Sequence, residues 1–384
     1  MFREYEGLLD LKDVIKDKYG YGFDKDNIED FYEQDFVSIE GNGVSAMCWI
    51  DIDNDKYLFK PMEDFKVNVL GELLSEKIAK KLGIPCAEYR ACVLGNQGGV
   101  LTKNFVKDND TMILGCEVFQ QFFNQYPLKR DDCVSVLDDE TFVDNYAVPK
   151  DFKNLNLYDQ QRYLFSHLNN LEEVWSILSD LDNKDIESNK NVVSALKNML
   201  LFDLITLQGD RHVNNWAIIK KDDGSYGPCP LFDNAISMGV GYFNMRDRLS
   251  NFRNEDFLSR KGMSNNINKM LYQSKPHFTL SEDNNLDPLH KIKDSNLVVF
   301  NDYLEKSDES FREEAIEMIS MINGDVTDSM LDEIEEENGF IVNSEVRGYI
   351  DRVMDIHNDN LLQIAEKYKS SEVRNDGEKS SRRI

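Results

Sequence analysis

Short apolar segments separated by turns dominate the N-terminal part of the chain, a pattern that predicts β-strands. Strands are predicted at 36–39, 44–52, 56–60, 89–94 and 100–106. Pro61 ends the third of them, because proline has no N–H group to donate to a neighbouring strand. Between the strands, 67–82 carries apolar residues at a spacing near 3.6, which predicts a helix that ends at Gly83. Residues 36–107 are therefore predicted to form a small antiparallel sheet that carries one helix.

After Lys107 the apolar spacing is mostly helical. Helices are predicted at 170–181, 191–207, 308–323, 328–338 and 344–368. Two short apolar segments, 216–219 and 229–232, flank the turn Asp222-Asp223-Gly224-Ser225 and predict a hairpin. The second part of the chain is therefore predicted to be larger and mainly helical.

Three further segments complete the predicted organisation. Residues 1–35 mix charges with aromatics and predict a helix and a cap on the sheet. Residues 234–300 are rich in Asn, Asp and Ser, which predicts a long loop, and the polar residues 370–384 predict a disordered tail. The chain is thus divided into a sheet-containing lobe, 1–107, and a helical lobe, 108–369, followed by the tail.

Asp210 lies in a loop directly after the apolar end of the predicted helix 191–207. A carboxylate that a rigid helix supports, but that a loop exposes, suits a general base acting on an acceptor hydroxyl. The alternative is that Asp210 only caps a turn. Its offsets from Asn215 and Asp233 favour the catalytic role, because phosphoryl transfer needs this acid together with an amide and a second acid.

Asn215 and Asp233 stand near the two outer ends of the predicted hairpin, and a hairpin brings its ends together. Their amide and carboxylate oxygens are therefore predicted to converge and to hold Mg²⁺, which prefers oxygen ligands and retains phosphate and water oxygens. Asn214 offers the same amide one residue earlier. The five-residue offset from Asp210 favours Asn215.

Lys60 ends a predicted strand, from which its ammonium group is expected to reach the α- and β-phosphates of ATP. An acid on the following helix would orient it. Glu72 lies in the first part of that helix, and Glu76, one turn later on the same face, is the alternative. Beside the proposed base, His212 is predicted to brace the loop and Arg211 to pair with an acid or a phosphate.

The turn Gly41-Asn42-Gly43-Val44-Ser45 precedes Lys60, and its glycines would let main-chain N–H groups approach phosphate oxygens. A plain β-turn explains the same residues. Ser45 is also a hypothetical autophosphorylation site, which phosphopeptide mapping after incubation with ATP would test. The stretch 100–106, with Lys103 and Phe105, is predicted to receive the adenine between apolar side chains, although a core strand would have a similar composition.

Composition narrows the classes of partner. The chain has 384 residues, 41% of them hydrophobic, which predicts a folded globular protein. Its net charge of −27 disfavours nucleic acid and anionic membranes as partners.

No apolar run reaches the roughly 18 residues of a membrane helix, and the N-terminus lacks the apolar core of a signal peptide. We therefore expect a cytoplasmic location, with signal-free secretion as the alternative. The six cysteines are scattered and predict free thiols. The acids of 332–337 predict a solvated helix face or a docking site for a basic partner.

These residues resemble those of the HipA-like serine/threonine kinases, including the compact bacterial CtkA-type members, and more distantly the phosphatidylinositol 3- and 4-kinases. The likeness covers most of residues 36–240. The matching motifs are Lys60-Pro61, Glu72 with Ile78-Ala79-Lys80-Lys81-Leu82-Gly83-Ile84-Pro85, Gly209-Asp210-Arg211-His212-Val213-Asn214-Asn215, and Phe232-Asp233. The end of the helix at 78–85 is the feature that favours HipA-like over lipid kinases, whereas Asp233 is followed by Asn234 and does not continue as the Asp-Phe-Gly motif of other kinases.

The resemblance implies an α+β, two-lobed protein-kinase-like fold with a small antiparallel-sheet N-lobe and a larger, mainly helical C-lobe. It also implies ATP and Mg²⁺ as cofactors and a protein serine or threonine as acceptor. Two alternatives remain. One is a kinase of the same fold for a lipid or small alcohol, for which the basic residues within 241–262 would be suited. The other is a non-catalytic nucleotide-binding interaction module.

Overall fold

The computed structural model describes residues 8–11, 37–40, 47–52, 55–62, 65–94, 97–122, 169–181, 186–240, 267, 270–271, 274–280, 294–339 and 341–381. The chain forms two compact units, each assembled from segments that are distant in sequence. The first unit contains Met1–Phe105, Pro230–Met270 and Ile316–Leu362, and the second contains Val106–Cys229, Leu271–Ala315 and Gln363–Ile384.

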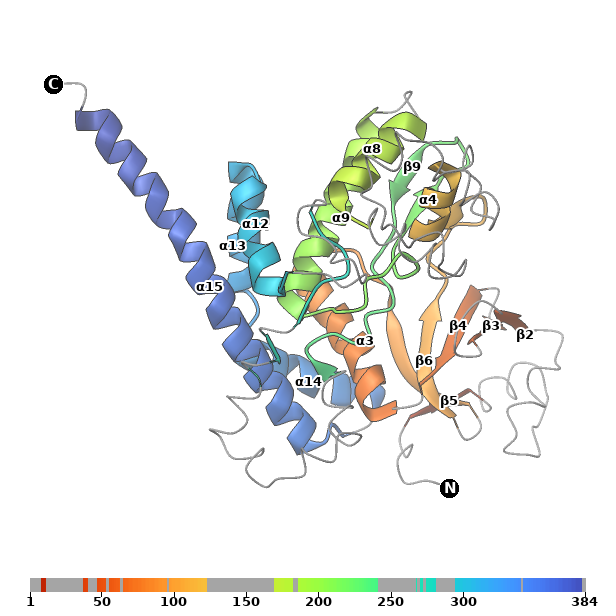
Figure 1. Cartoon of the computed structure of the whole chain (residues 1–384). Coiled ribbons are helices and arrows are strands. Elements are labelled where there is room, and N and C mark those ends of the chain that lie inside the picture. Colours follow the sequence, from red (N-terminus) through yellow and green to blue (C-terminus); the bar gives the residue numbers. More distant parts are fainter. Residues whose placement is uncertain are drawn as a thin grey trace, which may run out of the picture. The chain divides into compact units, whose positions relative to one another are not determined.

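The first unit is built on a six-stranded sheet of order β1-β5-β6-β4-β3-β2 (Figure 1). Its strands are β1 (Leu9–Asp10), β2 (Val37–Glu40), β3 (Met47–Ile52), β4 (Asp55–Pro61), β5 (Tyr89–Leu94) and β6 (Gln97–Lys103). The pairs from β5 to β2 are antiparallel, whereas β1 pairs in parallel with β5. The predicted antiparallel sheet is therefore wrong at this edge, where the sheet is mixed. A strand of two residues has too little alternation to be detected in the sequence.

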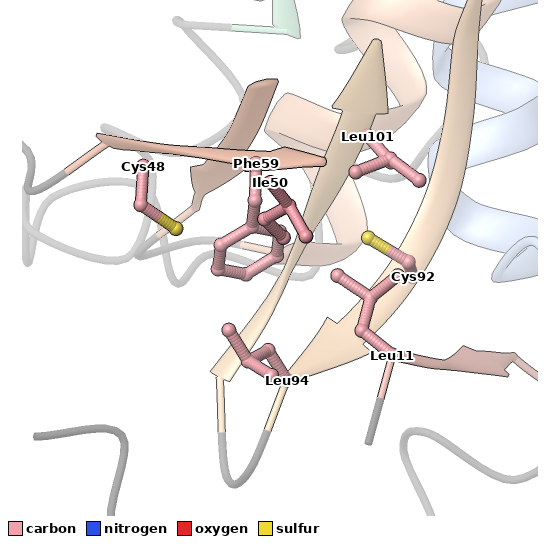
Figure 2. Close-up of a cluster of buried hydrophobic side chains, with 7 residues drawn as sticks. All are labelled: Leu11, Cys48, Ile50, Phe59, Cys92, Leu94 and Leu101. Atoms are coloured by element: carbon pink, nitrogen blue, oxygen red, sulfur yellow. The ribbon is translucent and has the colours of Figure 1, made fainter. Parts of the chain in front are cut away.

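The two faces of this sheet carry different side chains, because successive residues of a strand point to opposite sides. Figure 2 shows the buried apolar cluster on one face, formed by Leu11, Cys48, Ile50, Phe59, Cys92, Leu94 and Leu101. Phe59 of β4 belongs to this cluster, so Lys60, the next residue, points to the other face. A slip of β4 by one residue would turn Lys60 into the apolar cluster, so the cluster fixes the register that positions the lysine.

Helix α3 (Phe65–Lys81) is the helix predicted at 67–82, and it is buried along several sides. β5 and β6 contact it, and so does α14 (Gly324–Asn338). A later segment lies equally close, since a Cβ added to Gly71 would stand 2.2 Å from the carbonyl oxygen of Ala235. These C-terminal segments belong to the first unit because they cover α3. The predicted division into two contiguous lobes stays a prediction.

The acids of α14 have partners within the first unit. Lys77 of α3 pairs with Glu333 and Glu337, and Arg347 of α15 (Ser344–Ser381) pairs with Asp328, Asp332 and Glu335. Exposed ion pairs contribute little to stability individually. These ion pairs nevertheless occupy carboxylates of α14 that a basic partner would otherwise bind. The docking of such a partner stays a prediction.

The second unit contains a three-stranded antiparallel sheet of order β7-β8-β9, formed by β7 (Thr111–Leu114), β8 (Ala217–Lys220) and β9 (Tyr226–Pro228). Its helices are α4 (Gly115–Phe122), α8 (Leu171–Leu181), α9 (Ile186–Thr206) and α12 (Asn296–Lys306), while α13 (Glu309–Ser320) and α15 each run from one unit into the other. Helix α9 packs against β9, α8 and α12. Buried Trp216 has its ring centroid 5.8 Å from those of Phe119 and Phe278 and anchors the start of β8.

The predicted helices at 67–82, 170–181, 191–207, 308–323, 328–338 and 344–368 are confirmed with shifted ends. The longest shift is in α15, which runs to Ser381, whereas the sequence predicts a tail from residue 370. That stretch is polar but has no proline, and its Glu, Lys and Arg residues have good helix propensity. None of the helices in the described part of the chain combines the length and the apolar character that crossing a bilayer requires.

Two predicted elements are wrong. The segment 229–232 is not a strand: β9 ends at Pro228, because Pro228 and Pro230 lack the N–H groups of a ladder, and Leu231 forms only an isolated bridge with Cys86. The predicted loop 234–300 contains the start of α12, whose buried residues show a helical spacing in the sequence. Of the segment 1–35, for which a helix and a cap are predicted, the structure describes only 8–11, which contain the strand β1, and the rest lies outside the described residues.

Replacing Gly71 by alanine is predicted to destabilise the protein by about 1–3 kcal/mol, because the new methyl group would overlap the main chain at Ala235. Gly348 provides the control. It also lies inside a helix, but a Cβ there meets nothing within 4 Å, so Gly348→Ala should stabilise the protein by up to ~1 kcal/mol. Urea unfolding midpoints measure both changes, and a Gly71→Ala variant as stable as Gly348→Ala would contradict the close approach.

Candidate functional site

Lys60, Glu72 and Asp233 come from three separate segments and meet in the first unit. Lys60 Nζ lies 3.4 Å from Glu72 Oε1 and forms a second ion pair with the carboxylate of Asp233. The β4 register places Lys60 on the α3 side of the sheet, and α3 carries Glu72. The Glu72 side chain is fully buried, whereas those of Lys60 and Asp233 are 21% and 36% exposed. The cluster therefore has a buried end at Glu72 and a solvent-accessible end at Asp233.

The charges of this cluster support one another. Burial alone would lower the pKa of the Lys60 ammonium group, but the carboxylates of Glu72 and Asp233 outweigh burial and raise that pKa. Burial raises the pKa of Glu72, and the positive charge of Lys60 opposes this change. Glu72 Oε2 also accepts the N–H of Asn234 at 2.7 Å, which favours the ionised carboxylate. Lys60 thus carries a stable positive charge and is held in place by a buried acid.

The main chain at Asp233 adopts an uncommon conformation. Its φ of 56° lies in the left-handed region, which residues other than glycine rarely occupy. The N–H of Asp233 donates to the Tyr89 hydroxyl at 3.2 Å, and the preceding Phe232 has its ring centroid 6.4 Å from that of Phe105. Such strained residues persist where their surroundings hold them, and they cluster at functional sites.

Asp210 lies in the second unit, in the loop that follows α9. Its main chain is held: the N–H donates to Gln208 Oε1 at 3.1 Å, and the carbonyl accepts the Asn215 side-chain amide at 2.7 Å. The Asp210 carboxylate is 39% exposed and lies 3.9 Å from His212 Nε2. An exposed carboxylate on a fixed main chain has the accessibility that a general base requires.

Arg211 is completely buried and pairs with an acid, one of its two predicted kinds of partner. Its Nε donates to Asp203 Oδ2 at 3.0 Å and its Nη2 to Asp203 Oδ1 at 2.9 Å. Its Nη1 donates to the carbonyl of Asn215 at 2.7 Å. Burial raises the pKa of Asp203, and the guanidinium group opposes that change. The pair ties the loop to α9.

Asn215 is buried and the neighbouring Asn214 is exposed. Because the side-chain nitrogen of Asn215 donates to the Asp210 carbonyl, its amide oxygen points away from that carbonyl. His212 braces the loop, since its carbonyl accepts the Asn215 N–H at 2.8 Å and its Nδ1 accepts the Asn214 N–H at 3.2 Å.

Two residues that the sequence analysis did not single out also hold this loop. Asn169 donates to the Arg211 carbonyl at 3.0 Å and accepts the Trp216 indole N–H at 2.8 Å. Asp203 is the buried partner of Arg211. Asp203 has a sequence signal, because a lone acid within the apolar run 200–205 of a helix must find a buried partner. Asn169 has none, since its partners are distant in the chain.

The remaining predicted site residues have different surroundings. Glu76 accepts the main-chain N–H of Tyr89 at 2.7 Å and so fastens β5 to α3. Lys103 pairs with Asp55 at 2.6 Å on the exposed surface. The turn Gly41-Asn42-Gly43-Val44-Ser45 and the basic segment 241–262 lie outside the described residues, so their roles stay predictions.

The structure thus brings Lys60, Glu72 and Asp233 together in one unit, and Asp210 and Asn215 together in the other. The convergence of Asn215 with Asp233 on one ion stays a prediction. Within the described ranges, no group of three or more His, Cys, Asp and Glu side chains is arranged to hold a metal. The predicted ligands are one carboxylate and one amide, hard oxygen donors whose chemistry fits Mg²⁺ when phosphate and water oxygens complete the shell.

Comparison with known proteins supports the resemblance at the level of the fold. No protein-family model and no curated protein sequence matches the chain. The crystal structure of a proinflammatory kinase of Helicobacter pylori, CtkA, is similar over 87% of this chain and 96% of that chain, with a TM-score of 0.53 and 14% identity. HipA of Shewanella oneidensis MR-1, solved with HipB and operator DNA, aligns with 88% of this chain and 64% of its own, at a TM-score of 0.38 and 12% identity. The fold is therefore α+β and resembles that of a CtkA-type, HipA-like kinase, as predicted.

Replacing Arg211 by methionine is predicted to cost about 3–5 kcal/mol of unfolding free energy at pH 8, because Asp203 would stay buried without its cation. The pKa of Asp203, already raised by burial, should rise further in the variant. A carboxyl whose pKa is raised in the folded state contributes stability at low pH that is lost as the pH rises. The difference in unfolding free energy between the variant and the wild type should therefore shrink toward pH 5.

The double variant Arg211→Met with Asp203→Leu serves as the control for this pair. It should recover much of the lost stability and remove the pH dependence. Denaturation with urea at pH 5 and pH 8 measures both effects, and a single variant with the same deficit at both pH values would contradict the role of Asp203.

Proposed function

We propose that the protein is an ATP- and Mg²⁺-dependent phosphotransferase of the HipA-like kind that phosphorylates serine or threonine in a protein. The observation that carries this proposal is the meeting of Lys60, Glu72 and Asp233. Kinases require a strand lysine paired with a helix glutamate, next to an aspartate that binds the metal. The similarity of the fold to that of a kinase and the exposed Asp210 on its fixed loop also support the proposal.

Lys60 would bind the α- and β-phosphates, and Glu72 would keep it in place from the buried side. We expect the phosphates to replace Asp233 as a partner of Lys60, because they offer more negative charge to the ammonium group. Asp233 and Asn215 are the residues that would hold Mg²⁺, which neutralises charge on the phosphates when it is bound. Phe105 would contact the adenine.

Asp210 would orient the acceptor hydroxyl and accept its proton as the new bond to phosphorus forms. Its main-chain bonds to Gln208 and Asn215 keep the carboxylate from turning away. Positioning of this kind, together with charge neutralisation, supplies most of the acceleration in phosphoryl transfer. Gln208 would therefore contribute through rigidity rather than through contact with the substrate, and Asn215 would add rigidity to its role at the metal.

Transfer of label from γ-labelled ATP to a generic basic protein tests the proposal. Asp210→Asn should lower kcat by about 10²–10⁴-fold with nearly unchanged nucleotide affinity, because it removes the base and retains the phosphate-binding groups. Asp233→Asn should abolish both metal-dependent nucleotide binding and turnover. Asp222→Asn, which removes an exposed acid at the hairpin turn, is the matched control and should retain full activity.

The same assay separates the alternatives. Wild-type protein that labels phosphoinositide vesicles but no protein would indicate a lipid kinase of this fold. Binding of Mg-ATP in a thermal-shift assay without any transfer would indicate a non-catalytic module. Equal activity of wild type and Asp210→Asn would refute the assigned base. A protein substrate and a cytoplasmic location stay part of the proposal.

A further inference from the structure

Asp233 combines two demands that oppose each other. Its carboxylate must be placed within reach of the Mg-nucleotide, yet its main chain has a left-handed φ of 56°, a region that aspartate visits only occasionally. It also forms an ion pair with Lys60, which competes for the same carboxylate. Something outside the side chain must therefore hold this residue if it is to serve as a metal ligand. This inference rests on the proposed function.

Tyr89 provides such a hold, because its hydroxyl oxygen accepts the N–H of Asp233 at 3.2 Å. This hydrogen bond fixes the peptide group before Asp233, and so restricts the rotation that would release the left-handed conformation. The next peptide group is fixed as well, since Asn234 donates to Glu72 Oε2 at 2.7 Å. Both peptide groups that flank the Asp233 Cα atom are thus bound to side chains of the sheet and of α3.

Tyr89 is itself held firmly. It pairs with Thr102 in the β5–β6 ladder, and its main-chain N–H donates to Glu76 Oε2 on α3 at 2.7 Å. Two residues further along β5, the Ala91 N–H donates to the Asn338 side chain at 2.9 Å, which ties the strand to α14. Burial, and after it the Glu72 carboxylate, raises the pKa of the Tyr89 phenol well above its ordinary value.

We propose that Tyr89 is a positioning residue, whose hydroxyl presets the main chain of Asp233 so that its carboxylate is placed to bind the Mg-nucleotide once the phosphates replace it at Lys60. Tyr89 does not touch the reacting atoms in this proposal. Its loss should weaken metal binding while leaving the phosphate contacts of Lys60 intact. The predicted signature is a split between metal affinity and nucleotide affinity.

Tyr89→Phe removes one oxygen atom and keeps the ring. Titration of the wild type and the variant with Mn²⁺ in the presence of a non-hydrolysable ATP analogue, followed by electron paramagnetic resonance, measures metal binding without turnover. We expect about tenfold weaker Mn²⁺ binding in Tyr89→Phe, since the loss of groups that orient a metal ligand typically costs 10–100-fold in affinity. The affinity for the analogue without metal should be unchanged.

Tyr303→Phe is the matched control, because the Tyr303 hydroxyl is buried and has no hydrogen-bond partner among the described residues. It should bind Mn²⁺ like the wild type. If Tyr89→Phe also binds Mn²⁺ like the wild type, or loses affinity for metal-free analogue to the same extent, the positioning role is refuted while the proposed function stands. If the wild type binds neither analogue nor Mn²⁺, the proposed function fails and this inference fails with it.

Discussion

Glu72 is a carboxylate without contact to solvent, and the first unit is arranged to satisfy it. Taking such a group out of water costs several kcal/mol unless charge and hydrogen bonds replace its hydration. Lys60 supplies the charge and the Asn234 N–H supplies a hydrogen bond. Lys60 lies on β4, the strand just before α3, whereas Asn234 follows Glu72 by 162 residues, so satisfying the acid brings the segment after Pro230 to the helix. Asp233 reaches Lys60 as a consequence, because it precedes Asn234.

The second unit uses a related arrangement. Arg211 and Asp203 form a fully buried pair, and the same guanidinium group holds the carbonyl of Asn215. The buried charges fix the loop, and the residue before Arg211, Asp210, keeps an exposed carboxylate. In each unit, then, a buried carboxylate that is paired with a cation lies near a partly exposed acid. Removing the Arg211–Asp203 pair would affect Asp210 through the geometry of the loop, whereas removing Lys60 would also take an ion-pair partner away from Asp233.

The parts of this site that sequence predicts are those set by local periodicity. The alternation of Phe59 and Lys60 on a strand, and the helical spacing around Glu72, place both side chains before any contact is known. Asp233 is identifiable from its motif, but its left-handed main chain is not, because Tyr89 and Glu72 impose it from distant segments. The misplaced strand at 229–232 has the same origin. Leu231 is a real core residue, yet the prolines prevent a ladder and a single bridge to Cys86 replaces it.

This distinction explains how the fold can be similar to that of a kinase at only 14% identity. Alternating apolar positions specify a sheet without specifying which apolar residue occupies each, so most of the core is free to diverge. Few positions lack that freedom. Gly71 admits no side chain beside the Ala235 carbonyl, and Glu72 needs a cation that only a lysine or arginine on the facing strand supplies. The percentage of sequence identity counts every position equally, so it is dominated by the many positions at which the residue can vary. A comparison of structures responds to the arrangement that the few constrained positions enforce.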